Sequence, residues 1–221
     1  MDIIAFPETN LTGYVNPEQH PHMVLRLDGP EVAQAGALTK GKSPTALVGD
    51  LEENPNGKPF ISQLVVRDGR LVGVYRKMTQ GEAEDGGLED WHAVGESVPV
   101  FQHDALTFGI AICADSDNEH VFAECARQGA RIVFEVAAPG LYGDQATRDW
   151  ESSFRWWEDD CQTLLSRYAA TYGIWIAVAT QAGRTMDEDF PGGGYVFAPD
   201  CRCVFATPDW SAGMVIVEVP V

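Results

Sequence analysis

The chain carries, at residues 106–115, the sequence Leu-Thr-Phe-Gly-Ile-Ala-Ile-Cys-Ala-Asp. Its first seven residues are almost all apolar, and a run of this kind is typical of a strand that is buried on both faces. Such strands occur in sheets that helices cover, so the stretch predicts a layered fold of helices and sheets. Cys113 follows the strand directly, where side chains leave the core yet remain held by it.

Further strands and helices are predicted on both sides of this stretch. Apolar runs predict strands at residues 3–6, 45–50, 60–66, 71–75, 131–137, 174–180, 195–198, 203–206 and 214–219. Asp68-Gly69 predicts a tight hairpin, since both turn positions tolerate positive φ. Helical spacing predicts helices at 31–39, 121–128 and 150–171. Because hairpins and strand–helix–strand units are mixed, we expect an α/β or α+β fold, built as a single domain over residues 1–221.

The composition excludes several classes of function. The 221 residues include 33 Asp and Glu against 15 Lys and Arg, which gives a formal net charge of −18. A surface this negative repels phosphate backbones and anionic lipid, so we expect no nucleic-acid partner and no membrane role. No stretch approaches the roughly 18–20 apolar residues of a membrane span, and the first residues lack the pattern of a signal peptide.

The cysteines favour a reducing compartment. There are five of them, an odd number with no CxxC pair, which is typical of free thiols in the cytoplasm. Cys201-Arg202-Cys203 could supply half of a metal site, but no second pair or nearby histidine completes it. We therefore expect a cytoplasmic protein that uses no metal and no cofactor.

Three polar residues stand at predicted strand ends. Glu8 follows the strand at 3–6, Lys77 ends the strand at 71–75, and Cys113 ends the strand at 106–112. Taken alone, each is more typical of a solvated charge or a small buried thiol. Together they can perform acyl transfer. A carboxylate takes the thiol proton, and an ammonium stabilises both the thiolate and the oxyanion that forms when the thiolate attacks a carbonyl.

The segments around these residues resemble the sequence blocks of the nitrilase superfamily of carbon–nitrogen hydrolases, whose catalytic set is Glu, Lys and Cys. Phe6-Pro7-Glu8 with Thr12-Gly13-Tyr14 is similar to its glutamate block, Tyr75-Arg76-Lys77 to its lysine block, and residues 109–115 to its nucleophile block. The resemblance covers about residues 3–219. It implies a four-layer α-β-β-α sandwich, from which the family's usual first strand and helix are missing here because only Met1-Asp2 precede the strand at 3–6.

The resemblance also implies roles for single residues. Glu8 would be the general base, Lys77 the oxyanion-stabilising cation, Cys113 the nucleophile and the backbone N–H of Ala114 a second oxyanion donor. A second active-site glutamate is expected between the lysine and cysteine blocks. Glu89 fits its position better than Glu82 or Glu84. Further residues are expected to contact the substrate: Tyr14, Trp91, Ala114 and Ala138.

The substrate class stays open at this point. Nitrile-cleaving members tend to have Trp-Glu after the nucleophile, whereas Ala114-Asp115 resembles the amidase and carbamoylase branches, although this dipeptide could serve packing alone. We expect a small amide as substrate, with an N-carbamoyl compound or a nitrile as the alternatives. Residues 190–194 (Phe-Pro-Gly-Gly-Gly) depart from the family's Gly-x-Ser, and a non-catalytic interaction module is the remaining hypothesis.

The helix at 150–171 predicts self-association. It carries more apolar width than one face of a helix needs, through Trp150, Phe154, Trp156, Trp157 and Tyr168. Relatives pack helices across a two-fold axis, so we expect a homodimer or larger homo-oligomer through this helix. The alternative is that all of these aromatic side chains pack within one subunit.

Overall fold

A computed structural model describes residues 2–81, 88–141, 145–185 and 188–220. Its first sheet contains β1 (Ile3–Ala5), β2 (Val24–Leu25), β3 (Thr45–Glu52), β4 (Phe60–Arg67) and β5 (Arg70–Arg76). β1 and β2 both run parallel to β3 along one edge, while β4 and β5 follow antiparallel on the other side. Asp68 and Gly69 join β4 to β5 with φ of +47° and +81°, which confirms the predicted hairpin.

The second sheet has the strand order β13-β12-β9-β8-β7-β6. The central strands β7 (Leu106–Ile112), β8 (Ile132–Ala137) and β9 (Trp175–Thr180) are parallel and pack against helices on one face, as their continuous apolar runs predict. Three outer strands pair antiparallel: β6 (Phe101–His103), β12 (Gly194–Phe197) and β13 (Cys203–Ala206). A separate ribbon joins β10 (Ala182–Arg184) to β11 (Asp189–Pro191).

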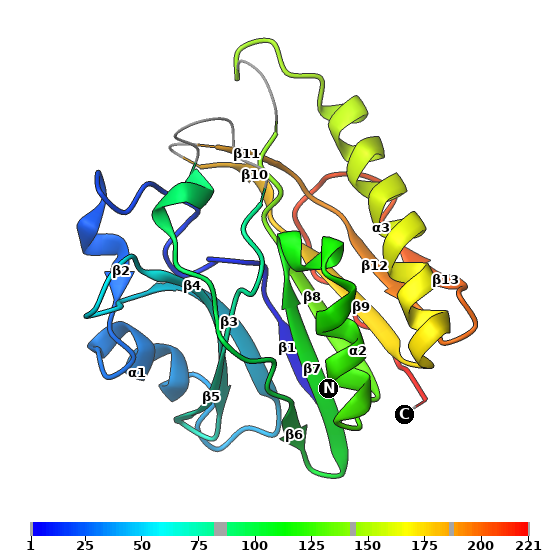
Figure 1. The fold of residues 1–221 in the computed structure, drawn as a ribbon, viewed down its shortest axis with the longest axis horizontal. Helices are drawn as coiled ribbons and strands as arrows, with labels where there is room; N and C mark the ends of the chain where they lie inside the picture. The colour runs from blue at the N-terminus through cyan, green and yellow to red at the C-terminus, as the bar shows by residue number, and fades with distance from the viewer. Residues whose placement is uncertain (1, 82–87, 142–144, 186–187, 221) are drawn as a thin grey trace.

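The elements stack in four layers, which confirms the predicted α-β-β-α sandwich. α1 (Pro30–Ala37) covers the outer face of the first sheet, and α2 (Glu119–Arg127) and α3 (Trp150–Tyr172) cover that of the second (Figure 1). The main core contains residues of both sheets, among them Leu47 and Ile110. Three short 3₁₀ turns complete the elements described: η1 (Pro21–Met23), η2 (Leu88–Trp91) and η3 (Cys113–Asp117).

Local signals explain the bounds of α3. The Asp149 side chain accepts hydrogen bonds from the backbone N–H groups of Glu151 and Ser152, and Gly173 ends the helix with φ of +65°. Inward-facing side chains of this helix, including Phe154, Trp157 and Tyr168, are buried within the subunit, whereas Trp156 is 43% exposed. Most of the aromatic side chains that were expected to form an interface thus pack inside one chain.

One predicted strand is wrong. Residues 207–220 contain no helix or strand in the described structure, although Met214–Val219 alternates like one. Met214 and Ile216 are exposed there, and no described strand pairs with the segment. Alternation of apolar residues is thus not enough to form a strand, which also needs a neighbouring strand to pair with.

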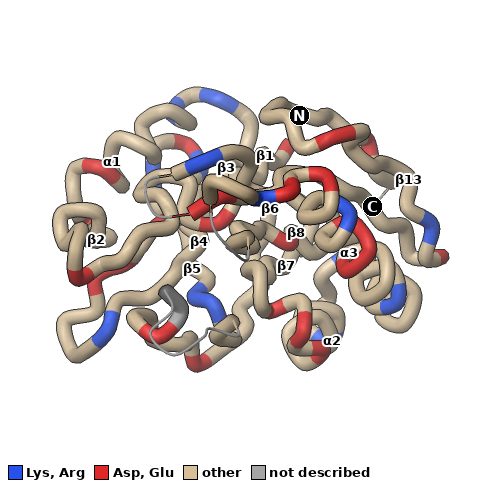
Figure 2. Tube along the Cα trace, turned by 90° about the horizontal axis from the view of Figure 1, so that it is seen from above, with Lys and Arg blue, Asp and Glu red and all other residues tan. Residues whose placement is uncertain are grey.

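The charge is spread over many segments rather than gathered in one place. Acidic residues recur along the trace (Figure 2), and in the chain as a whole they outnumber the basic ones by 33 to 15. Within the described ranges, no helix is both long enough and apolar enough to cross a membrane.

Candidate active site

Glu8 and Lys77 meet inside the molecule as a buried ion pair. Glu8 lies just after β1 and Lys77 just after β5, and their side chains are 0% and 3% exposed. The Lys77 Nζ donates to Glu8 Oε1 at 3.0 Å, and the backbone N–H of Ala138 donates to Glu8 Oε2 at 2.8 Å. A buried carboxylate costs free energy unless it is paired and hydrogen-bonded, and Glu8 has both kinds of partner.

Close packing of the backbone holds Glu8 in place. A Cβ atom at Gly49 on β3 would lie 2.3 Å from the backbone N of Thr9 and 2.8 Å from the carbonyl oxygen of Pro7. The backbone N–H of Gly49 also donates to Asn10 Oδ1 at 2.7 Å. Because Gly49 has no side chain, the loop that carries Glu8 lies directly on β3.

Cys113 and Ala138, the residue whose backbone N–H binds Glu8, follow neighbouring strands of the second sheet. Cys113 follows β7 and opens η3, while Ala138 follows β8. Since β7 and β8 are parallel with Ile112 beside Val136, the two chain segments leave the sheet side by side. Cys113 has φ of +49°, an uncommon conformation for a residue with a side chain, and such strain concentrates at functional sites. Its side chain is half-buried.

Asp115 joins the nucleophile turn to the first sheet. Its carboxylate accepts from the Tyr75 hydroxyl at 2.7 Å and from the backbone N–H groups of Met78 and Ile112 at 3.1 and 3.0 Å. Burial raises the pKa of this carboxyl above its usual value, although these donors act in the opposite direction. Asp115 therefore ties the segment beside Lys77 to the turn that carries Cys113. The sequence pointed to Asp115 only as a marker of substrate class.

The substrate contacts expected of Tyr14, Trp91, Ala114 and Ala138 stay predictions, and the structure gives the surroundings of each residue. Tyr14 is buried, and its ring lies 6.3 Å from His92 and 6.1 Å from Phe190, centroid to centroid. Trp91 is half-buried beside His92. Ala114 is half-buried next to Cys113, and Ala138 holds Glu8 as described above.

Three residues are candidates for the second active-site glutamate. The backbone of Glu89 lies in η2, whereas Glu82 and Glu84 lie outside the described residues. The choice between them stays a prediction. His92, whose ring neighbours Tyr14, was missed because one histidine in a loop carries no pattern.

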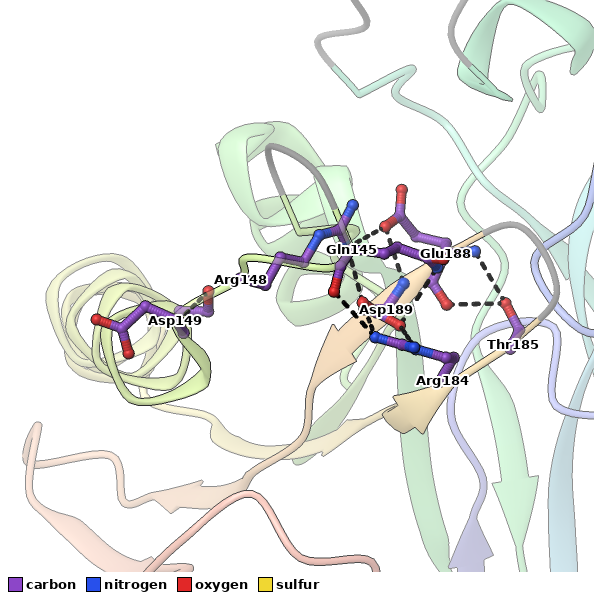
Figure 3. A network of polar contacts seen from close by, with 8 residues as sticks. Gln145, Arg148, Asp149, Arg184, Thr185, Glu188 and Asp189 are labelled. Carbon is purple, nitrogen blue, oxygen red and sulfur yellow. Dashed lines mark hydrogen bonds and ion pairs between the residues drawn. The ribbon is translucent and has the colours of Figure 1, made fainter.

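A polar network fixes the chain that continues from Ala138. Arg148 contacts Glu188 at 2.5 Å and Asp189 at 3.5 Å, and Arg184 Nε donates to the Asp189 carboxylate at 2.7 Å (Figure 3). The backbone N–H of Leu141 donates to the Asp189 carbonyl at 3.1 Å. These contacts hold the segment after β8 against β11, and so support the position of the Ala138 N–H.

Within the parts of the chain that the structure describes, no three His, Cys, Asp or Glu side chains gather as a metal ion would require. The groups described above are the buried Glu8–Lys77 ion pair, the backbone N–H of Ala138 and, after the neighbouring strand β7, the thiol of Cys113. Such a set suits nucleophilic attack by sulfur on a carbonyl.

Comparison with known proteins identifies the family to which this fold belongs. The family model of carbon-nitrogen hydrolases matches residues 1–221, and the chain belongs to this family. A formamidase from Allorhizobium ampelinum is 32% identical over 139 residues, which are 62% of this chain and 40% of that protein. The chain thus spans well under half the length of the curated formamidases it matches.

Two solved structures share the fold. A variant of the amidase from Nesterenkonia sp. AN1, with acrylamide added at its active-site cysteine, superposes with a TM-score of 0.77 at 19% identity, covering 99% of this chain and 80% of that one. The glutamine-dependent NAD+ synthetase from Acinetobacter baumannii superposes with a TM-score of 0.76 at 20% identity, covering 96% of this chain and 38% of that one.

Proposed function

We propose that this chain hydrolyses a small amide to a carboxylic acid and ammonia through a thioester on Cys113. One observation carries the proposal: the buried Glu8–Lys77 pair is held by the N–H of Ala138, which leaves the sheet beside the strained Cys113. The likeness to formamidases supports an amide as the substrate.

The first half of the reaction forms the thioester. Glu8 takes the thiol proton of Cys113, and the thiolate attacks the amide carbonyl carbon. The Lys77 ammonium and the backbone N–H of Ala114 stabilise the oxygen that becomes negative in the tetrahedral intermediate. Glu8 then returns the proton to the amide nitrogen, so that the C–N bond breaks and ammonia leaves.

The second half releases the acid. Glu8 takes a proton from a water molecule, and the resulting hydroxide attacks the thioester carbonyl. Lys77 stabilises the second oxyanion, the C–S bond breaks, and the proton returns to the sulfur of Cys113. One carboxylate thus acts as base and acid twice, which requires that Glu8 remain close to both the sulfur and the leaving group.

The decisive experiment compares Cys113→Ala with Cys201→Ala in an ammonia-release assay. Cys201 is exposed on the segment between β12 and β13, so its loss serves as the matched thiol control. We expect Cys113→Ala to lower kcat by more than about 10³-fold, because no other group can form the thioester. Full amidase activity in Cys113→Ala would contradict the nucleophile assignment.

Substrate class is tested with the same assay. Formamide and other simple amides, glutamine, an N-carbamoyl amino acid and a nitrile are compared at equal concentration. Glutamine is included because the fold is shared with a glutamine-dependent enzyme over nearly all of this chain. We expect simple amides to be cleaved fastest. Faster cleavage of the carbamoyl compound or the nitrile would assign the chain to that branch instead.

The non-catalytic alternative is tested by thiol reactivity. An activated Cys113 reacts with iodoacetamide at neutral pH faster than Cys125, Cys161, Cys201 and Cys203. Burial already raises the pKa of Cys125 to about 12. If Cys113 reacts no faster than the exposed Cys201, an interaction module is favoured.

We also propose that residues 1–221 form one domain of a cytoplasmic homodimer or larger homo-oligomer, joined through α3. The shared core of both sheets supports the single domain, and Trp156, which is 43% exposed, places aromatic surface on the outside of α3. Because the chain has a formal net charge of −18, the dissociation constant of a dimer should fall as salt screens the repulsion between subunits. A monomer by light scattering at micromolar concentration, in low and moderate salt, would contradict it.

A further inference from the structure

Glu135 is an acidic side chain in the middle of an otherwise apolar strand. β8 reads Ile-Val-Phe-Glu-Val-Ala, and all six residues are buried, with Glu135 at 0% exposure. Neither of its carboxyl oxygens has a hydrogen-bond partner among the described residues. A buried polar group without a partner destabilises the fold, so packing alone does not account for a carboxyl group here.

The register places this carboxyl group behind the nucleophile. Glu135 pairs with Ala111 on β7, two residues before Cys113, and lies three residues before Ala138. The preceding pair on the same face is Gly109 and Val133, and a Cβ atom at Gly109 would meet the sulfur of Cys125 on α2. This face therefore points toward the helices, whereas Glu8 and Lys77 approach from the first sheet.

We propose that Glu135 is a positioning residue for the nucleophile, which supports the strained Cys113 turn from the helix side of the second sheet. The inference rests on the proposed role of Cys113 as nucleophile. Cys113 has positive φ, and the backbone N–H of this same residue is near enough to Glu135 to act on its carboxyl group, where it lowers the pKa against the larger effect of burial. A polar group at this place can hold the turn in the conformation that presents the thiol.

The charge of Glu135 matters as much as its position. Burial, and then the nearby carboxylates of Asp115 and Glu8, hold the pKa of Glu135 well above its usual value, while Lys77 acts in the opposite direction. The other titratable groups that interact with it are Cys161 on α3 and Tyr75 on β5. An uncharged Glu135 adds no negative charge beside the thiolate, whereas an ionised one would oppose its formation.

The experiment measures alkylation of Cys113 by iodoacetamide between pH 6 and 10, with the Cys113 peptide quantified by mass spectrometry. Wild type is compared with Glu135→Gln, which keeps the polar acceptor and removes the titration, and with Glu135→Leu, which removes both. Asp50→Asn is the matched control, because Asp50 is also a buried carboxyl group without a described partner but lies on β3. Retained folding is checked by circular dichroism.

We expect Glu135→Gln to match wild type within about twofold at pH 7, because its amide oxygen keeps the polar acceptor. Glu135→Leu should react about tenfold more slowly at neutral pH, equivalent to one pKa unit of lost thiolate stabilisation. Asp50→Asn should follow wild type throughout. If Glu135→Leu does not fold, Glu135→Met, which is closer in length to Glu, takes its place.

Two results would overturn the proposal in different ways. If Cys113 is reactive but Glu135→Leu, or Glu135→Met in its place, is alkylated at the wild-type rate, Glu135 has no positioning role and the proposed function stands. If wild-type Cys113 is no more reactive than the exposed Cys201, both the proposed function and this inference are wrong.

Discussion

The two faces of the first sheet each bury a carboxyl group and surround it in opposite ways. On the face toward the second sheet, Glu8 receives a lysine ammonium and a backbone N–H. Asp50 is the next residue after Gly49 on β3, so its side chain points to the opposite face from the one on which the Glu8 loop packs. Asp50 is 0% exposed and has no hydrogen-bond partner among the described residues. Burial raises the pKa of Asp50 to about 8, with a smaller contribution from Glu52.

The difference shows what distinguishes a site from a buried charge. A carboxylate that is to act as a base near neutral pH must be ionised, and inside a protein this requires a cation or hydrogen-bond donors. Glu8 has both, whereas Asp50 holds a proton instead. Burial alone would indicate a functional role for both Glu8 and Asp50. The two residues differ in their hydrogen-bond and ion-pair partners, which Glu8 has and Asp50 does not have among the described residues. The following predictions test this separation, from the largest expected effect on catalysis to the smallest.

The first prediction removes the cation. Lys77→Met leaves Glu8 buried without its ion partner and removes the charge that stabilises the oxyanion. We expect amidase activity to fall by more than about 10³-fold, since removing even one oxyanion donor costs about 10²–10³. The free energy of unfolding should fall by about 3–5 kcal/mol. Steady-state kinetics and urea denaturation measure the two effects.

A double variant separates the two roles of Lys77. Glu8→Gln with Lys77→Met no longer buries an unpaired charge, so it should regain part of the lost stability and none of the activity. The control is Arg67→Met, which breaks the surface pair with Asp104 (2.6 Å) and should leave the melting temperature unchanged. If the double variant is less stable than Lys77→Met, the ion pair does not explain the stability loss.

The second prediction concerns Asp115, which is buried like Asp50 but has three neutral donors. In Asp115→Asn one acceptor oxygen becomes an amide nitrogen that cannot accept, so at least one donor from Met78, Ile112 or Tyr75 loses its partner. An orphaned buried donor costs about 1–3 kcal/mol, so we expect kcat to fall about 10–100-fold as the Cys113 turn loosens.

The neighbouring Asp117 supplies the control. It belongs to the same short turn but is exposed, so Asp117→Asn should leave kcat unchanged. Equal losses in the two variants would mean that the turn responds to its total charge rather than to the hydrogen bonds of Asp115.

The third prediction displaces Glu8 without changing any polar group. In Gly49→Ala the added Cβ would overlap the backbone of Pro7 and Thr9, which must move away from β3. We expect the free energy of unfolding to fall by about 1–3 kcal/mol and kcat to fall about tenfold. Gly57→Ala is the control, because its Cβ would meet only Asn54 Nδ2 at an ordinary 3.6 Å. Unchanged kinetics in Gly49→Ala would show that the Glu8 loop tolerates displacement.

The sequence predicts those parts of the site that depend only on neighbouring residues in the chain. Glu8, Lys77 and Cys113 each follow an apolar run, and the end of a strand can be recognised without knowing its neighbours. The Asp68-Gly69 hairpin is equally local. Three sequence blocks in family order then indicate the sandwich through the resemblance they carry.

The parts that the sequence does not predict depend on contacts between distant segments. The Ala138 N–H that binds Glu8 is 130 residues away in the chain, and Asp115 meets Tyr75 across 40 residues. Glu135 gives no sign of its position, since its place behind Cys113 depends on the register of β7 with β8. Met214–Val219 shows the converse error, because its alternation predicts a strand, whereas no strand of the described ranges pairs with it.

The last prediction concerns Asp50, where the expected effect on catalysis is none. The pKa of Asp50 is about 8 in the folded protein, against about 3.9 for an unfolded aspartate. Between these values the unfolded chain loses a proton that the folded chain keeps, so the free energy of unfolding falls as pH rises from about 4 to 8. Each pH unit in that window lowers it by up to about 1.4 kcal/mol.

Asn at position 50 is uncharged at every pH and nearly the same size as a protonated Asp. Asp50→Asn should therefore match wild type in stability near pH 4 and exceed it progressively toward pH 8, with unchanged kcat. Urea denaturation at several pH values measures this difference. A constant stability difference across the window would show that Asp50 is ionised in the folded state, and then burial without a partner would not be enough to separate it from Glu8.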